Sequence, residues 1–142
     1  MQEHFPKRPF RTHGGAPVPH HKNTWQTPTV EMPPPARVVL PMQQHIGAPC
    51  RPVVKKGDYV YLGQVVGQSD AYVSAPVHAS VSGTVAEVTK IMLTGGQPVE
   101  AVVIESDGLM EPDPEIRPPE RIYDKKTLAG AAKAAGLVGL GG

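Results

Sequence analysis

Proline and glycine, at 17 and 15 of the 142 residues, constrain the fold of this chain more than any other feature of its sequence. Proline has no backbone N–H to donate and glycine loses the most backbone entropy on folding, so a chain this rich in both is not mostly helical. Aromatic residues make up only 5%, so the core must be small and built from valine, isoleucine, leucine and alanine. The length allows one domain plus tails.

Charge and cysteine content exclude several classes of protein. A net charge of +1 does not fit a generic basic nucleic-acid binder. Cys50 is the single cysteine, so the chain alone forms no internal disulfide and holds no cysteine-ligated iron–sulfur cluster, which favours a reduced, cytosolic protein. The sequence has neither an apolar run of about 18 residues nor an apolar segment after Met1, so we expect no transmembrane helix and no secretory signal.

The N-terminal third is predicted to be an extended arm over residues 1–35. Residues 1–52 contain 11 of the prolines and carry a charge of +4, and each proline pushes the residue before it towards an extended conformation. A basic cluster at residues 7–11 contains Lys7, Arg8 and Arg11. We interpret it either as part of a solvated arm or as a docking point for an acidic protein surface or the cytoplasmic leaflet.

Residues 36–106 have the pattern of short strands separated by turns, with Gly57, Asp58 and Gly83 at turn positions. Apolar and β-branched runs predict strands at 37–40, 53–54, 59–62, 65–66, 84–89 and 99–105, and a further short apolar piece at 72–73. This spacing is typical of a small sandwich or barrel.

Residues 107–123 are predicted to be an acidic, proline-rich linker, and residues 124–142 a helix followed by the start of a glycine-rich loop. Asp124 is suited to cap a helix over about 125–135, and Gly136 suits the position just after it. One face of this helix is apolar and contains Leu128, Ala131, Ala132 and Ala135.

The core contains both halves of a known pattern. Residues 54–66, VKKGDYVYLGQVV, match V-x-x-G-D-x-V-x-x-G-Q-x-[VLI], and residues 79–85, ASVSGTV, match A-x-x-x-G-x-V. The chain thus resembles biotinyl/lipoyl-type domains, which implies an all-β barrel-sandwich hybrid fold. Carriers of this type attach their prosthetic group to a lysine on an exposed hairpin, but Val73 occupies that position and no lysine lies between Lys56 and Lys90. We therefore do not expect a biotin or lipoate carrier.

A narrower resemblance covers roughly residues 9–142. The strings FRTHGG (10–15), QHIGAP (44–49) and VSAPVHASVSG (73–83), together with the core pattern, look like the N-terminal region of RnfC, one of the proteins of the Rnf electron transport complex. That family belongs to a membrane-bound complex that couples ferredoxin and NAD to ion movement. The resemblance implies FMN and [4Fe–4S] clusters in the full-length family member, the other subunits of the complex as partners, and a location on the cytoplasmic side, peripheral to the membrane.

In that family the helix leads into a glycine-rich segment that approaches a flavin or NADH. Gly136, Gly139, Gly141 and Gly142 fit its first part and are the candidate cofactor-binding residues. Glycine-rich loops let backbone N–H groups come close to a phosphate. The loop is incomplete and the family's cysteine motifs are absent, so we expect no cofactor in this chain, which resembles an N-terminal fragment or an excised domain.

Other kinds of site find less support in the sequence. Zinc needs three or four ligands, and the only grouping to consider is Cys50, His45 and His78, for which hydrogen bonding of loop histidines to the backbone is the simpler interpretation. Asp58 and Asp70 are a conceivable carboxylate pair, but a turn explains Asp58. The spacings of metallopeptidases and the G-x-S-x-G elbow are missing, so no catalytic residue is assigned.

We therefore interpret the chain as a structural and docking module of an Rnf-type electron-transfer subunit, with no cofactor of its own. The alternative is a stand-alone biotinyl/lipoyl-like adaptor that binds a partner protein without a prosthetic group.

Overall fold

The computed structural model describes residue 19, residues 21–118 and residues 121–139 of the chain. The chain divides into two units, Met1–Met32 and Pro33–Gly142. In its described residues the first unit has one short turn, in which the Thr27 hydroxyl donates to the carbonyl oxygen of Thr24 at 2.8 Å, and neither helix nor strand. The basic cluster at 7–11 lies outside the described residues.

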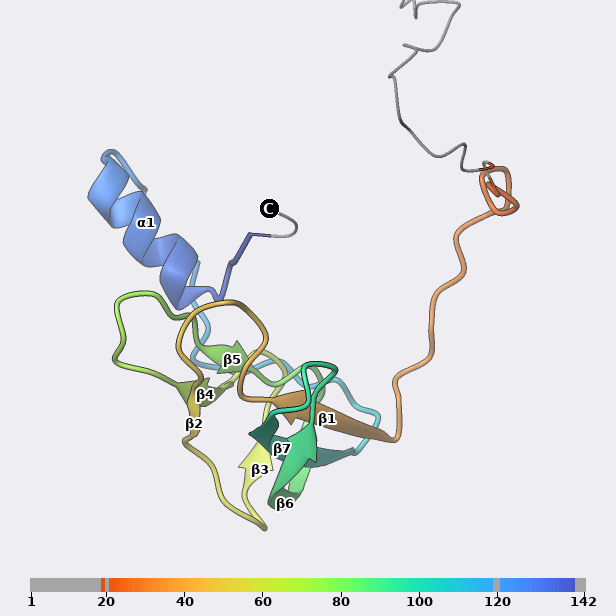
Figure 1. Cartoon of the computed structure of the whole chain (residues 1–142), viewed down its shortest axis with the longest axis horizontal. Coiled ribbons are helices and arrows are strands. Elements are labelled where there is room, and N and C mark those ends of the chain that lie inside the picture. The colour runs from red at the N-terminus through yellow and green to blue at the C-terminus, as the bar shows by residue number, and fades with distance from the viewer. Residues whose placement is uncertain (1–18, 20, 119–120, 140–142) are drawn as a thin grey trace, which may run out of the picture. The chain divides into compact units, whose positions relative to one another are not determined.

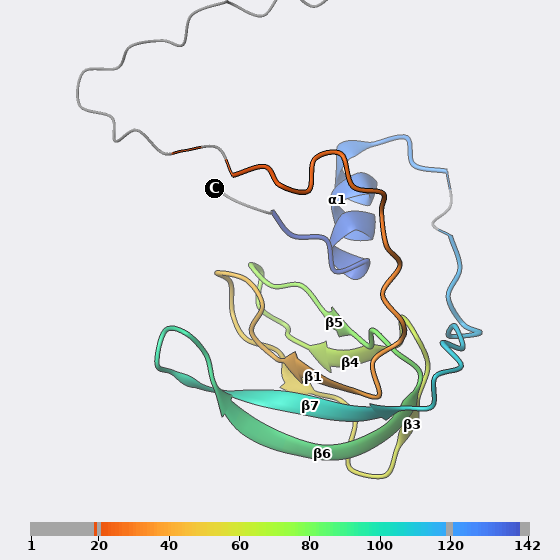
Figure 2. The ribbon, with the colours of Figure 1, turned by 90° about the vertical axis from the view of Figure 1, so that its right-hand side faces the viewer.

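The second unit is built from two antiparallel sheets (Figure 2). The larger sheet has the order β1-β7-β6-β3 and the smaller one β2-β4-β5. The strands are β1 (Arg37–Pro41), β2 (Arg51–Pro52), β3 (Tyr59–Val60), β4 (Val65–Gln68), β5 (Val77–His78), β6 (Gly83–Met92) and β7 (Pro98–Ser106).

The β6–β7 hairpin is the longest pairing in the fold and runs from Gly83↔Ser106 to Met92↔Pro98, with an irregularity in register between Val85 and Glu87. The β-branched residues of both strands favour this extended structure. β1 pairs with the other edge of β7, from Arg37↔Glu105 to Pro41↔Ala101. This hairpin supplies buried residues from both strands.

The core lies between the two sheets. Its fully buried side chains come from both of them and from the loop after β1, and they include Met42, Val60, Val66, Val85, Val102 and Ile104. The core is therefore small and aliphatic, as its composition predicts. The prediction of an all-β, barrel-sandwich hybrid core with one C-terminal helix is confirmed.

Several strand predictions differ from the structure in detail. The predicted strand at 53–54 is wrong, because β2 is Arg51–Pro52; Val53 still donates its N–H to the carbonyl oxygen of Val66 at 3.0 Å. The apolar piece at 72–73 lies at an exposed bend, since no neighbouring strand pairs with it. The strand β5 was not predicted, because its two residues are ordered by pairing with β4.

The helix α1 (Lys125–Ala134) begins and ends as the sequence predicts. Asp124 Oδ1 accepts hydrogen bonds from the N–H groups of Lys126 and Thr127, both at 2.9 Å, so it is the N-cap. Gly136 follows the C-cap with a φ of +70°. No residue of α1 is buried, and no helix in the described part of the chain is long and apolar enough to cross a membrane.

Candidate docking surface

Two loops, residues 43–50 and 69–76, meet at one end of the barrel, next to the C-terminal end of α1 (Figures 1 and 2). Ala48 donates its N–H to the carbonyl oxygen of Val73 at 2.9 Å. The buried Cys50 thiol donates to the carbonyl oxygen of Ala75 at 3.1 Å, and burial raises its pKa. The thiol therefore acts as a hydrogen-bonded core group.

His45 fastens the same two loops. Its Nδ1 lies 2.9 Å from the backbone nitrogen of Gly47 and its Nε2 lies 3.2 Å from that of Ala75. A neutral imidazole has one acceptor nitrogen, so the ring accepts from one of these N–H groups at a time. The role of His45 in this geometry is the backbone hydrogen bonding expected of a loop histidine.

The grouping considered for zinc is not formed. Cys50 and His45 each contact the backbone of Ala75, whereas His78 lies on β5. Among the described residues no three histidine, cysteine or acidic side chains gather as metal ligands. The three side chains considered for zinc are therefore not brought together, and no metal site is assigned to them.

The 69–76 loop occupies the place of the carrier hairpin, and a lysine from another element holds it. Val73 and Tyr72 are 61% and 95% exposed. Lys133 of α1 reaches over and donates to the carbonyl oxygens of Ala71 at 3.0 Å and Tyr72 at 3.1 Å. A loop that would present a modified lysine in a carrier instead presents two apolar side chains and is tied to the helix.

Gly136 lets the end of the helix lie against β5. A Cβ at this position would come within 2.9 Å of the carbonyl oxygen of Pro76 and 3.0 Å of Nδ1 of His78. Of the other candidate cofactor-binding glycines, Gly139 has open space around it, and Gly141 and Gly142 lie outside the described residues. Gly136 therefore has a packing reason to be glycine, and a cofactor role for the four glycines stays a prediction.

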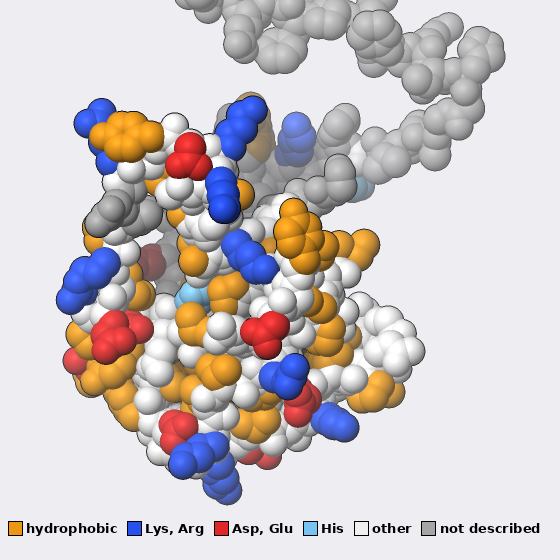
Figure 3. Space-filling model, turned by 90° about the vertical axis from the view of Figure 1, so that its left-hand side faces the viewer, with side chains coloured by type: hydrophobic (Ala, Val, Ile, Leu, Met, Phe, Trp, Pro, Cys, Tyr) orange, Lys and Arg blue, Asp and Glu red, His pale blue; other side chains and the backbone are white. Residues whose placement is uncertain are grey.

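Exposed apolar side chains collect around these contacts. Ile46 lies on the first loop, Tyr72 and Val73 on the second, and Leu137 and Val138 follow the helix, all of them exposed. We call these five residues the apolar end. Figure 3 shows a face of the molecule on which hydrophobic side chains lie open among scattered lysines, arginines and carboxylates.

A polar network that sequence reasoning missed holds the 107–112 segment to the barrel. Ser82, which is fully buried, donates to Oδ1 of Asp107 at 2.7 Å and accepts from the N–H of Glu111 at 2.9 Å. The Tyr59 hydroxyl donates to Oδ2 of Asp107 at 2.7 Å. The segment continues along the barrel, where Leu62 donates its N–H to the carbonyl oxygen of Glu111 at 2.8 Å.

The ionisation of this network follows from its hydrogen bonds. The bond from Tyr59 lowers the pKa of Asp107, with help from Leu109 N–H and Ser82, because all three donate to the charged carboxylate. The same bond raises the pKa of Tyr59 to about 12. The hydrogen bond therefore favours the charged carboxylate of Asp107 and the protonated hydroxyl of Tyr59, and we assign the network a structural role. Turn residues at 107–108 are the only signal for it in the sequence.

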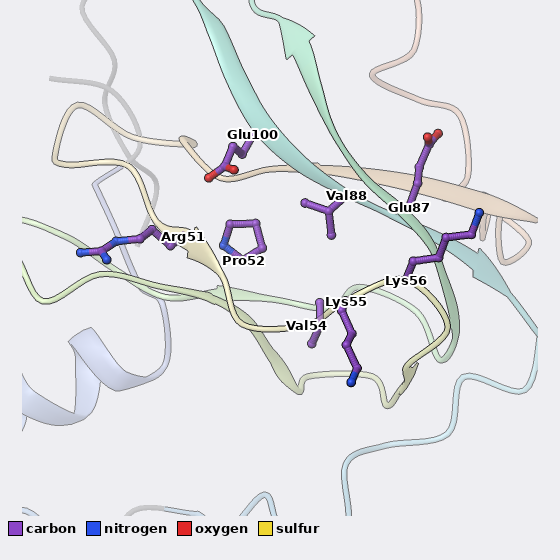
Figure 4. Close-up of a pocket in the computed structure, with 8 residues that line it drawn as sticks. All are labelled: Arg51, Pro52, Val54, Lys55, Lys56, Glu87, Val88 and Glu100. Carbon is purple, nitrogen blue, oxygen red and sulfur yellow. The ribbon is translucent and has the colours of Figure 1, made fainter.

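A surface pocket of about 720 Å³ lies between residues 51–56 and the strands β6 and β7 (Figure 4). It is open to one side, and its lining mixes acidic and basic groups with Pro52, Val54 and Val88. In Figure 4 the side chains of Arg51, Lys55 and Lys56 point in three different directions. Without convergent polar groups this pocket does not indicate a ligand.

Comparison with known proteins gives the family. The model of the RnfC barrel sandwich hybrid domain matches residues 10–109. The chain belongs to the RnfC family. The resemblance drawn from the sequence is thus confirmed.

Three relatives, each the RnfC component of its complex, show how much of the RnfC protein is present. The chain is 48% identical over 136 residues to that of the Na⁺-translocating ferredoxin:NAD⁺ oxidoreductase complex of Acetobacterium woodii, covering 91% of this chain and 30% of the relative. It is 42% identical over 124 residues to the proton-translocating counterpart of Clostridium ljungdahlii, covering 85% and 27%. It is 37% identical over 147 residues to that of the ion-translocating oxidoreductase complex of Rhodobacter capsulatus, covering 96% and 27%. The chain therefore spans less than a third of the length of these curated relatives.

Proposed function

We propose that this chain is the N-terminal docking module of the RnfC protein in an Rnf-type ion-translocating ferredoxin:NAD⁺ oxidoreductase. The observation that carries the proposal is the altered carrier loop in an RnfC-family domain. The position of the modified lysine is Val73, and the loop is tied by Lys133. A barrel of this type without a carried group is suited to holding other parts of a protein assembly in place.

The chemistry is assigned to the remainder of the RnfC protein. The relatives are more than three times as long as the segment they share with this chain, which leaves room for other domains. FMN, [4Fe–4S] clusters and the NAD(H) site are proposed to lie there. In that arrangement Gly136, Gly139, Gly141 and Gly142 begin the loop that reaches the flavin or NADH.

The module is proposed to sit on the cytoplasmic side, peripheral to the membrane, against other subunits of the complex. The proposed division is an arm over 1–35, the barrel over 36–106, a linker over 107–123 and the helix with the loop start over 124–142. Residues 1–35 carry four basic and two acidic side chains, a net charge of +2, which supports docking through the arm to an acidic surface, with the cluster containing Lys7, Arg8 and Arg11 as the contact.

A chimera tests the function. The matched segment of the Acetobacterium woodii RnfC protein is replaced by residues 1–142 of this chain, and the complex is purified through a different subunit. We expect the chimera to co-purify and to support NAD⁺-linked ferredoxin oxidation. A second chimera, with Lys7, Arg8 and Arg11 changed to glutamine, should accumulate to the same level but co-purify less.

The same experiment distinguishes the docking module from the alternative, a stand-alone adaptor domain. If the first chimera is folded, as judged by its circular dichroism and solubility, yet does not join the complex, the docking proposal fails. A stand-alone adaptor domain would then be the better interpretation. If the chimera joins the complex equally well with and without the three basic residues, the docking module is supported but docking through the arm is refuted.

A further inference from the structure

We propose that the apolar end, together with the exposed apolar face of α1, is an interface that packs against the remainder of the same RnfC protein. This inference rests on the proposed function, because it takes the chain to be the first part of a longer RnfC polypeptide. The occupant is an apolar surface of the segment that follows Gly139 in that polypeptide.

The first argument is the state of α1. The helix has ten residues, none of them buried, and Leu128 on its apolar face is exposed. Isolated helices shorter than about 12–15 residues are marginal in water, so helices in proteins depend on packing of an apolar face. The Asp124 cap and the Lys133 hydrogen bonds hold the two ends of the helix. Among the described residues nothing fully buries its apolar face: Ala131 and Ala132 are partly covered and Leu128 is exposed.

The second argument is where the chain leaves the helix. Gly136 lies against Pro76 and His78, and Leu137 and Val138 continue from there beside the two loops. The relatives extend well beyond the matched segment. Because a chain advances at most about 3.6 Å per residue, the segment that follows begins beside the apolar end. A short connection of this kind gives a covalently attached partner a high effective concentration.

The third argument concerns charge. A lipid surface favours apolar side chains surrounded by free lysines and arginines. The lysine beside Tyr72, Lys133, already donates to two loop carbonyl oxygens. Lys133 is thus committed to the loop, and the other lysines and arginines on this face are interspersed with carboxylates (Figure 3). The group of Ile46, Tyr72 and Val73 therefore fits an apolar protein surface better than an anionic membrane.

Hydrogen exchange on the chimera described above tests this interface against the isolated chain. We expect amides in 71–73 and 126–138 to exchange at least about tenfold more slowly in the chimera, as expected for a tightly packed contact. The turn at 93–97, at the far end of the β6–β7 hairpin, is the internal reference and should exchange equally in both. Equal exchange in 71–73 and 126–138 would overturn the proposal.

A matched pair of variants in the chimera gives the second measurement. Ile46→Ser with Tyr72→Ser removes apolar area from the apolar end, whereas Met92→Ser removes a similarly exposed side chain from the distal hairpin. The double variant should return the protected amides to the rates of the isolated chain, and Met92→Ser should not. Identical protection in both variants would refute the assignment of the surface.

The outcomes separate this inference from the proposed function. Protection without assembly into the complex keeps the interface and removes the docking role. Assembly into the complex without protection of these amides keeps the docking role and removes the interface. Binding of the isolated chain to vesicles of anionic phospholipid, lost in the Tyr72→Ser variant, would show that the apolar end meets a membrane and would also overturn the proposal.

Discussion

Replacing Gly83 by alanine should destabilise the barrel strongly, because Gly83 combines a left-handed φ with a close backbone contact. Its φ is +150°, and a Cβ would collide with the carbonyl oxygen of Glu105 and lie 2.9 Å from Cα of Ser106. Both belong to β7, which pairs with Gly83 and cannot retreat without breaking the longest hairpin. The strain costs about 1–3 kcal/mol and the overpacking about as much again.

A loss of about 2–6 kcal/mol is a large part of the roughly 5–15 kcal/mol that stabilises a domain. At about 4–8 °C per kcal/mol for a domain of nearly this size, the melting temperature should fall by about 10 °C or more in calorimetry or circular dichroism. Two controls separate the causes. Gly57→Ala has a φ of +91° but nothing within 4 Å, so it should cost only the backbone strain of about 1–3 kcal/mol. Gly95→Ala has neither feature and should be neutral.

The reasoning would be refuted if Gly83→Ala melted within a few degrees of wild type, or no lower than Gly57→Ala. The first result would show that β7 moves aside at little cost. The second would show that the φ alone matters and that the contact with Glu105 does not. Urea denaturation at constant m-value would check that the variants change stability and not the compactness of the denatured state.

The remaining predictions concern the Ser82 network, the loop at 71–73 and the absence of a bound group. Ser82→Ala removes one of the donors to Asp107 and leaves the N–H of Glu111 without its acceptor, so it should cost about 1–3 kcal/mol in urea denaturation, with Tyr59→Phe costing less. Absorbance at 295 nm should show one tyrosine titrating near pH 12 that is missing in Tyr59→Phe. Because the pKa of Tyr59 is raised in the folded protein, its contribution to the free energy of unfolding is present below about pH 10 and lost towards pH 12. The pKa of Asp107 is lowered, so its contribution is present above the ordinary value of 3.8 and lost as the pH falls below it. Lys133→Gln should speed hydrogen exchange of the 71–73 amides while Lys126→Gln does not, because only Lys133 holds that loop. The purified chain should be colourless, and its intact mass should be unchanged after co-expression with a biotin or lipoate ligase; a flavin band or a mass gain would contradict this.

The functional surface was less accessible to sequence reasoning than the fold. The absence of a lysine at Val73 was visible directly, because it is a statement about one position in a pattern. That Lys133 takes over this loop depends on a contact across 62 residues, which no local pattern reveals. The network of Ser82 likewise joins residues 25 and 29 positions apart, and its members look like ordinary turn residues.

The local preferences of the chain can be read from its amino-acid sequence alone. The excess of proline and glycine excluded a helical fold, the alternation of β-branched residues located β6 and β7, and Asp124 located the start of α1, since its side chain bonds only two and three residues ahead. These follow from φ and ψ preferences and short-range hydrogen bonds, which a residue carries wherever it is placed.

Long-range contacts, by contrast, determine which short segments form strands and which apolar residues remain exposed. Val77 and His78 form a strand because β4 is there to pair with them, while Tyr72 and Val73 have the better strand composition but no strand beside them. A backbone without a partner is left to water or to a side chain such as that of Lys133. The physical reason is that a strand is stabilised by hydrogen bonds and packing across the chain, so its presence depends on residues far away in the sequence.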